Sequence, residues 1–284
     1  MYKILVAIDF SNSANNTLNH AVSVAEKFKA KILLIWVESS KSLKHLNISR
    51  TDNLKEEVNN RFDSLISSIE SEELRNNLET FIIKGNSSEE IIKLAKEKQV
   101  DLIFEGSHGF HGFKRYLVGS NANKIIAEAS CPVITVRPNR EVNRELNTIV
   151  VPIDSTLDTR QKLPLTVKLA IVFGAEVHLL GLYFNKNVST KRKVDSYTEQ
   201  ADAYCKKYGV KDIVIHNVYT EDGARTIINY AKKVNAGLIS VMIEAEFGGS
   251  NWSLLSQGKQ FINQSPIPIL SIANKELIKR RPGL

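Results

Sequence analysis

The sequence repeats itself at a fixed offset, and this repeat constrains the fold more than any other feature. Five residues near the end of the first half occur again 136 positions later. The matching pairs are Ile91 and Ile227, Ala95 and Ala231, Leu102 and Leu238, Ile103 and Ile239, and Pro132 and Pro268. The two halves also open alike, because an apolar run ends at Asp9 in the first and at Asp154 in the second. An internal duplication is therefore predicted, with two domains of the same build.

Short apolar runs alternate with segments of helical spacing in each half. In the first half the runs fall at 4–8, 32–37, 80–83, 102–104 and 133–136, with helices expected around 18–25, at 54–69, at 88–98 and after Ser120. Segment 39–53 has mixed polarity and no clear period, so it is expected to be a loop. Continuous apolar runs indicate strands that are buried on both faces, as in a parallel sheet covered by helices.

The expected fold is therefore α/β, with two tandem open-sheet domains. Each domain is predicted to hold a five-stranded parallel sheet with helices on both faces, which is a Rossmann-like arrangement. We expect the first domain to cover 1–139, a linker to cover 140–146, and the second domain to cover 147–284.

Composition excludes several classes of protein. The formal net charge is +7, but lysines and arginines are interleaved with acids, so no nucleic-acid face is expected. The two cysteines, Cys131 and Cys205, lie in different halves and predict a reducing compartment, with Cys131 packed and unreactive. No stretch approaches the roughly 20 apolar residues that span a bilayer. We expect a cytoplasmic protein without membrane contact.

A glycine-rich loop follows the fourth predicted strand. Gly106, Gly109 and Gly119 lie between that strand and Ser120, which opens a helix. Glycines let a backbone approach a ligand closely, and the free N–H groups of a helix N-terminus bind anions. Asp9 ends the first strand, and ligands of open α/β sheets lie outside the carboxyl ends of the strands. A phosphate site is predicted there. Two loop histidines three apart also allow a metal interpretation, although no cluster of cysteines or carboxylates accompanies them.

The spacing of this loop resembles that of ATP-binding members of the universal stress protein family. Their pattern is Gly-x-x-Gly, nine residues, and then Gly-Ser or Gly-Thr, which Gly106, Gly109, Gly119 and Ser120 match without a gap. The resemblance extends from the opening strand to the segment that starts at Cys131. It implies the Rossmann-like fold of the adenine nucleotide alpha hydrolases. It also implies an adenine nucleotide, ATP, ADP or AMP, bound with or without Mg²⁺.

The same resemblance implies a role for each residue of the site. The backbone of Val37 would contact adenine, and Asp9 and Gly106 would lie near the ribose or a bound metal. Gly109, Gly119 and Ser120 would hold phosphates. The complete expected set is Ala7, Asp9, Val37, Glu105, Gly106, Gly109, Gly119, Ser120 and Asn121, with Asp9 also as the metal ligand.

Two positions depart from the family's usual residues. Glu105 stands where an apolar residue is common, and Asn121 where a small apolar residue is common. The carboxyl group of Glu105 would either hydrogen-bond a ribose hydroxyl or repel a phosphate.

The second half resembles the family less closely. At the offset of 136, Gly106, Gly109 and Gly119 become Met242, Ala245 and Leu255. Glu244 and Glu246 in the same turn would oppose an anion. This half is expected to keep the fold without the nucleotide, and Asp154 is expected to be a remnant or a helix cap.

Three functions remain open from the sequence. The leading hypothesis is a stress-response nucleotide binder that protein partners read and that is regulatory rather than catalytic. The alternatives are a slow metal-dependent ATPase that uses Asp9, and an interaction scaffold without a ligand. The resemblance also implies that the two domains pair through 133–136 and 269–272 as an intramolecular pseudo-dimer, and a further homodimer remains open.

Overall fold

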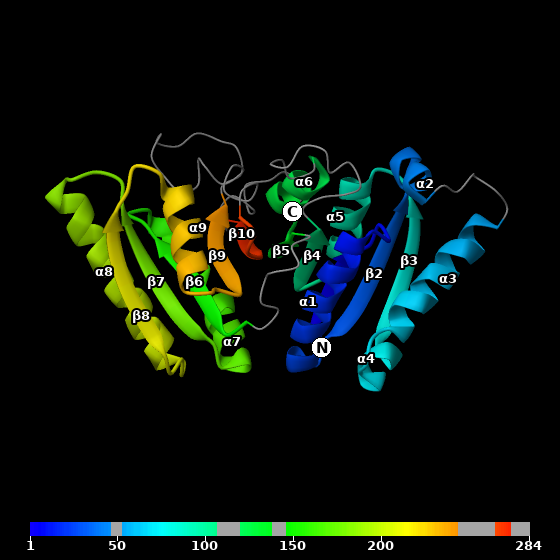
Figure 1. Cartoon of the computed structure of the whole chain (residues 1–284), viewed down its shortest axis with the longest axis horizontal. Coiled ribbons are helices and arrows are strands. Elements are labelled where there is room, and N and C mark those ends of the chain that lie inside the picture. Colours follow the sequence, from blue (N-terminus) through cyan, green and yellow to red (C-terminus); the bar gives the residue numbers. More distant parts are fainter. Residues whose placement is uncertain (47–52, 107–119, 138–145, 244–264, 274–284) are drawn as a thin grey trace. The chain divides into compact units, whose positions relative to one another are not determined.

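A computed structural model describes residues 1–46, 53–106, 120–137, 146–243 and 265–273. The chain divides into two compact units, unit 1 over Met1–Pro138 and unit 2 over Asn139–Leu284 (Figure 1). Each unit is described by itself. None of the helices in the described ranges is long and apolar enough to cross a membrane.

Unit 1 is a parallel sheet with helices between successive strands. Its strands are β1 (Lys3–Ala7), β2 (Lys31–Glu38), β3 (Leu78–Lys84), β4 (Leu102–Gly106) and β5 (Val133–Val136). Its helices are α1 (Asn12–Phe28), α2 (Ser40–Leu46), α3 (Leu54–Ser67), α4 (Glu72–Asn76), α5 (Ser87–Glu97) and α6 (Ser120–Glu128). The strand order is β3-β2-β1-β4-β5, and every pair is parallel. The predicted open five-stranded sheet is confirmed.

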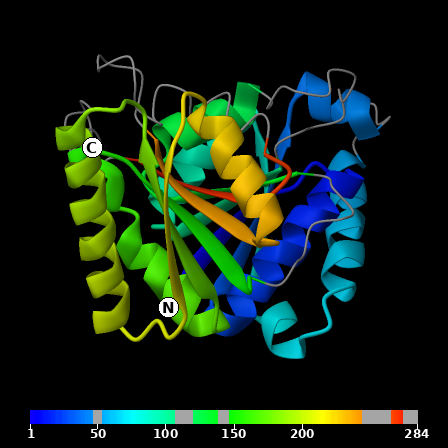
Figure 2. The same cartoon turned by 60° about the vertical axis from the view of Figure 1, so that its left-hand side comes forward.

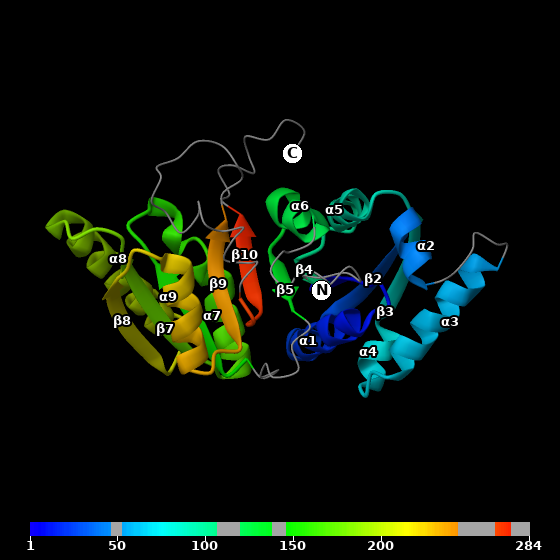
Figure 3. The same cartoon turned by 45° about the horizontal axis from the view of Figure 1, so that its top comes forward.

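The sheet of unit 1 is covered on both faces, which explains its continuous apolar strands. Ile4, Leu5 and Val6 of β1 are completely buried. Strand β2 lies on one side of β1 and β5 lies on the far side of β4, so right-handed crossovers place α1 and α6 on opposite faces. Figure 3 shows α5 and α6 on one side of β1 and β4, and α1 on the other.

The expectation of a loop over 39–53 is partly wrong, because α2 forms within it. Ser39 and Ser42 build a reciprocal cap at its start. The backbone N–H of Ser42 donates to Ser39 Oγ at 3.1 Å, and the N–H of Ser39 donates to Ser42 Oγ at 2.8 Å. This arrangement satisfies two orphan donors of a helix N-terminus. Leu43 and Leu46, three residues apart, are the two apolar residues of this helix and both are buried, a pair too short for a period search to detect.

Unit 2 repeats the same plan. Its strands are β6 (Thr148–Ile153), β7 (Glu176–Tyr183), β8 (Ile213–Tyr219), β9 (Leu238–Ile243) and β10 (Ile269–Ala273), and its helices are η1 (Leu157–Arg160), α7 (Leu163–Phe173), α8 (Val188–Lys207) and α9 (Gly223–Lys233). The parallel order is β10-β9-β6-β7-β8. Figure 2 shows α8 and α9 on either side of β7 and β8. The duplicated architecture is therefore confirmed, while most of the predicted linker lies outside the described residues.

Candidate functional site

A tight turn at the end of β1 fixes Asp9. Its Oδ1 accepts hydrogen bonds from the backbone N–H of Ser11 at 3.0 Å and from Ser11 Oγ at 2.5 Å. Ser11 also caps α1, because its Oγ accepts from the N–H of Ala14 at 3.2 Å. Phe10, between Asp9 and Ser11, adopts a left-handed backbone conformation with φ of 59°. Its ring packs edge-on against that of Phe62, with the two ring centroids 5.1 Å apart. The turn therefore holds the Asp9 carboxylate at the carboxyl edge of the sheet.

Gly106 ends β4 at the same edge, next to two hydroxyl groups of α1. A Cβ atom at this position would lie 3.4 Å from Ser13 Oγ and 3.5 Å from Thr17 Oγ1. The Thr17 hydroxyl donates to the carbonyl of Ser13 at 3.0 Å. Ser13 is only 8% exposed, and within the described part of the chain its Oγ has no hydrogen-bond partner. Because Gly106 has no side chain, its backbone adjoins the Ser13 hydroxyl. A buried hydroxyl without a partner costs free energy unless a ligand or a water molecule pairs with it.

Glu105 points to the other face of the sheet, because successive side chains of a strand alternate. Its register partner on β5 is Thr135. Its Oε2 atom is buried, and no described residue hydrogen-bonds to it. Burial, followed by the nearby charge of Asp9, raises the pKa of the Glu105 carboxyl to about 8. The Glu105 carboxyl, whose neutral form is favoured by burial, therefore lies near the carboxylate of Asp9, which accepts two hydrogen bonds.

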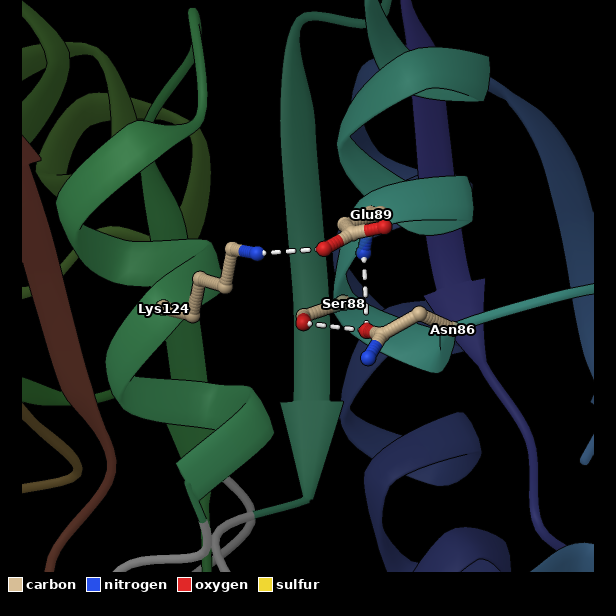
Figure 4. Close-up of polar contacts among 4 residues, drawn as sticks. All are labelled: Asn86, Ser88, Glu89 and Lys124. Atoms are coloured by element: carbon tan, nitrogen blue, oxygen red, sulfur yellow. Dashed lines mark hydrogen bonds and ion pairs between the residues drawn. The ribbon is translucent and has the colours of Figure 1, made fainter. Parts of the chain in front are cut away.

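Helix α6 begins on the face to which Glu105 points. Its first residue is Ser120, and the free N–H groups of its first turn form the positive end of the helix. An ion pair ties α6 to α5, because Lys124 Nζ lies 2.7 Å from Glu89 Oε1 (Figure 4). Asn86 caps α5 in turn, accepting from the N–H of Glu89 at 3.4 Å and from Ser88 Oγ at 2.8 Å (Figure 4). These contacts position the N-terminus of α6.

Three adjacent strands of unit 1 bring several of the predicted residues to one edge. Ala7 and Asp9 stand at the end of β1, and Glu105 and Gly106 at the end of β4, which pairs with β1. Val37 stands near the end of β2, and its carbonyl accepts from Ser42 Oγ at 2.7 Å, which leaves one carbonyl lone pair for another donor.

The remaining predicted residues are only partly described. Ser120 and Asn121 are the first two residues of α6, and the side chain of Asn121 is half-buried. The side chain of Ser120 lies outside the described residues, as do the phosphate-loop residues Gly109 and Gly119 and the two histidines between them.

Arg137 is a candidate that the sequence analysis missed. It follows β5 directly, and its Nε and Nη2 atoms are buried with no hydrogen-bond partner within the described ranges. Burial lowers the pKa of its guanidinium group. Its carbonyl accepts from Asn16 Nδ2 on α1 at 3.0 Å, which holds the segment after β5 against α1. A guanidinium group with unsatisfied donors suits an anion. An arginine directly after the last strand is the signal that would have found it.

Unit 2 contains the same aspartate turn. Asp154 Oδ1 accepts from the N–H of Thr156 at 2.9 Å and from its Oγ1 at 2.5 Å. The backbone N–H of Asp154 donates to Thr159 Oγ1 at 3.1 Å. Asp154 therefore closes the turn that leads into η1, whose N-cap residue is Thr156.

A buried lysine distinguishes the edge of unit 2 from that of unit 1. Lys162 is 2% exposed and occupies the position of Thr17, since the offset that equates Asp9 with Asp154 equates these two residues. Its Nζ donates to the carbonyl of Thr159 at 2.5 Å. Burial lowers the pKa of Lys162 to about 8, and the charge of Asp154 opposes this shift.

Met242 is buried where the offset of 136 places Gly106 in unit 1. Unit 2 thus has an ammonium group and a thioether side chain at positions where unit 1 has a hydroxyl and no side chain. Its other predicted substitutions, at Ala245 and Leu255, and the two acids Glu244 and Glu246 lie outside the described residues.

The parallel sheet, with an aspartate and a glycine at the ends of adjacent strands, defines a Rossmann-like α/β protein whose ligand edge is the carboxyl end of the sheet. The sequence profile of the universal stress protein family matches residues 1–137. A universal stress protein of Methanocaldococcus jannaschii is 30% identical over 145 residues, which cover 49% of this chain and 84% of that protein. The chain belongs to the universal stress protein family.

Further similarities agree with this membership. The universal stress protein YxiE of Bacillus subtilis is 29% identical over 145 residues, covering 48% of this chain and 98% of its own length. The crystal structure of a putative universal stress protein from Pseudomonas aeruginosa aligns with a TM-score of 0.69 over 98% of this chain and 95% of that one, at 17% identity. A universal stress protein from Archaeoglobus fulgidus aligns with a TM-score of 0.64 over 96% of both chains, at 16% identity. At these identities the two structures support the fold alone.

Proposed function

We propose that this chain is a stress-response adenine-nucleotide-binding protein whose unit 1 holds one ATP, ADP or AMP. The observation that carries the proposal is at Gly106, whose half-buried backbone, without a Cβ atom, adjoins the Ser13 hydroxyl that no described residue pairs with. The N-terminus of α6, the helix that follows β4 in the chain, supplies free backbone N–H donors for an anion. The loop spacing that resembles ATP-binding family members gives the ligand its class.

Unit 2 holds no nucleotide in this proposal. The buried side chain of Met242 replaces the glycine, and the ammonium group of Lys162 satisfies the local carbonyl of Thr159 from within the chain. Both groups take room that a nucleotide would need.

Mg²⁺ would enter this site with the nucleotide rather than alone. Magnesium prefers one or two carboxylates together with phosphate oxygens, and Asp9 is a suitable carboxylate. Within the described residues, no group of three or more His, Cys, Asp or Glu side chains is placed to hold a metal ion. The phosphates of the ligand would therefore complete the coordination.

The role we propose is regulatory, with bound nucleotide read by protein partners in the cytoplasm. Phosphoryl transfer needs positioned charge around the transferred group, and the described edge of unit 1 offers mainly carboxyls and hydroxyls, with Arg137 as its cation. We also propose that the chain forms two domains, over 1–139 and 147–284, and that these domains pair through their last strands. Steady phosphate release that Asp9→Asn abolishes would contradict the regulatory role and favour the ATPase.

Mass spectrometry of small molecules released from the purified, denatured protein tests the proposal. We expect about one adenine nucleotide per chain after loading with excess ATP or AMP. Gly106→Met copies the residue of unit 2 and should abolish retention, whereas the reciprocal Met242→Gly should leave it unchanged. Two nucleotides per chain would contradict the inactive second unit. A lack of stabilisation by either nucleotide would reject binding, since a ligand at about 100 times its dissociation constant stabilises a fold by roughly 2.7 kcal/mol.

A further inference from the structure

Strand β8 ends the strand order of unit 2, and among the described residues β7 is the strand with which it pairs (Figure 1). At the start of β8, the carbonyl of Asp212 accepts from the N–H of Val177 at 2.9 Å. At its end, the N–H of Thr220 donates to the carbonyl of Tyr183 at 2.9 Å. A parallel ladder uses every second residue of a strand, so the even-numbered residues face β7. The backbone N–H and C=O groups of the other residues point away from β7: Ile213, Ile215, Asn217 and Tyr219.

This free edge lacks the features that usually keep edge strands apart. The segment 213–219 contains no Asp, Glu, Lys, Arg or proline, and the side chains of Ile215 and Tyr219 are 46% and 40% exposed. Strand β3, which ends the strand order of unit 1, carries Glu79 in an ion pair with Lys31 at 3.0 Å. Charged side chains on an edge strand oppose pairing with another chain. The edge of unit 2 is therefore the one suited to such pairing.

The sequence of β8 matches an antiparallel copy of itself. A two-fold axis at His216 places Ile213 opposite Tyr219 of the second copy, and Ile215 opposite Asn217. The backbone groups of all four residues point outward, so each pair can exchange two hydrogen bonds, as an antiparallel ladder requires. A β-branched side chain opposite an aromatic one is a favourable cross-strand pair. This register therefore uses the whole length of the strand.

The charges that flank β8 fit the same register. Lys211, two residues before the strand, lies opposite Glu221 of the second copy, two residues after it, and the two-fold axis repeats this pair. Both side chains are exposed. Glu221 Oε1 accepts from the Tyr219 hydroxyl at 3.0 Å, which leaves Oε2 for the lysine. The second acid at this end, Asp212, lies opposite the neutral Thr220. Opposite charges that face each other across two strands stabilise the pairing.

We propose that β8 is a homodimer interface, in which the edge strands of two chains pair antiparallel about His216. The charge complementarity of Lys211 and Glu221 selects a second copy of this chain as the occupant. This role goes beyond nucleotide binding and gives a function to the unit that holds no nucleotide in the function proposed above. One pair of strands buries less surface than a standard protein interface, so the association is weak and depends on concentration.

Sedimentation velocity of the full chain tests the proposal at concentrations up to about 1 mM, which covers millimolar dissociation constants. The wild type should shift from monomer to dimer as the concentration rises. Lys211→Glu and Glu221→Lys should each weaken the dimer by about tenfold, because two attractive pairs become repulsive. The double variant exchanges the charges and should recover the wild-type Kd. Lys233→Glu, exposed in the last turn of α9, changes the net charge equally and should leave the Kd unchanged.

Cysteine cross-linking in a Cys131→Ala background tests the register. Opposite residues of a non-hydrogen-bonded pair lie about 4.5 Å apart between Cα atoms, which a disulfide can bridge. His216→Cys should therefore form a disulfide-linked dimer with oxidised glutathione. Tyr219→Cys is the control on the same strand, because its two copies lie about 20 Å apart in this register. A monomer at every concentration, or a dimer that the charge exchanges do not affect, would overturn the proposal. Cross-linking of Tyr219→Cys but not of His216→Cys would overturn the antiparallel register.

Discussion

The buried ammonium group of Lys162 makes the stability of unit 2 depend on pH in a direction that is unusual for a lysine. Burial outweighs the attraction of Asp154 and lowers the pKa of Lys162 from 10.5 to about 8 in the folded chain. Between these two values the unfolded chain binds the proton that the folded chain has lost. The free energy of unfolding therefore rises with pH across this range. At neutral pH the charged lysine destabilises unit 2 by about 3 kcal/mol, since each pKa unit corresponds to about 1.4 kcal/mol.

Lys162→Met removes this charge while keeping a long, unbranched side chain. The variant avoids the desolvation of about 3 kcal/mol and loses the hydrogen bond to Thr159, which is worth about 1 kcal/mol. We therefore expect it to be more stable than the wild type by about 2 kcal/mol at neutral pH. The difference should shrink by about 2 kcal/mol from about pH 7 to about pH 9.5, as the wild-type lysine loses its proton.

Pulse labelling of Cys205 during urea unfolding reports on unit 2 alone, because this thiol is fully buried in α8. The measurement is made in a Cys131→Ala background, and the labelling at each pH is normalised to the fully unfolded chain. Lys168→Met, on the exposed side of α7, the helix that directly follows Lys162, is the matched control and should not change the pH dependence. A difference between wild type and Lys162→Met that stays constant over this pH range would refute the reasoning.

Three further predictions concern single side chains. Gly181→Ala should destabilise unit 2 by about 1–3 kcal/mol, because the new Cβ would overlap the side-chain amide of Asn217, and urea unfolding in an Asn217→Ala background should recover most of the loss. Gly106→Ala should change stability by less than about 0.5 kcal/mol, since among the described residues its Cβ would meet two hydroxyls, at 3.4 Å and 3.5 Å; a larger loss in thermal unfolding would contradict this reasoning. Burial raises the pKa of Cys131 to about 12 and that of Cys205 to about 11, so iodoacetamide should label neither thiol quickly in the folded protein at mildly alkaline pH. Rapid modification of Cys131, followed by mass spectrometry, would show that it is not packed as described.

Most of the architecture follows from the sequence, because buried parallel strands produce continuous apolar runs that few other structures produce. The run at 133–136 coincides with β5, and the run at 102–104 lies within β4. Because the sequence is duplicated, the fold predicted for the first half also applies to the second. Helix α2 escaped prediction because it is short, with two serines that cap it and a single pair of buried leucines, Leu43 and Leu46, as its apolar face.

The candidate site was predicted less completely, because tertiary packing decides the environment of its polar residues. Ser13 and Thr17 stand in a polar stretch of α1 and were not among the predicted site residues, yet both are buried and lie next to Gly106 at the end of β4. Lys162 was not among the predicted residues, since local sequence does not reveal that its ammonium group is buried and donates to the carbonyl of Thr159 in η1. Glu105 was noticed as a departure from the family's residues, but its buried and unpaired oxygen depends on the surrounding fold.

The aspartate turn at the end of the first strand has a practical consequence for mutagenesis. It is built in the same way in both units, with Ser11 in one and Thr156 in the other, although only unit 1 has the open glycine beside it. The carboxylate therefore contributes to the local geometry of the chain whether or not a ligand is nearby. A loss of binding in Asp9→Asn combines damage to this geometry with any loss of contact to the ligand. The corresponding change at Asp154 removes the same turn contacts from a unit without the open glycine, and together with Lys162→Met, which removes the attraction between Asp154 and Lys162, it measures what the turn contributes to folding.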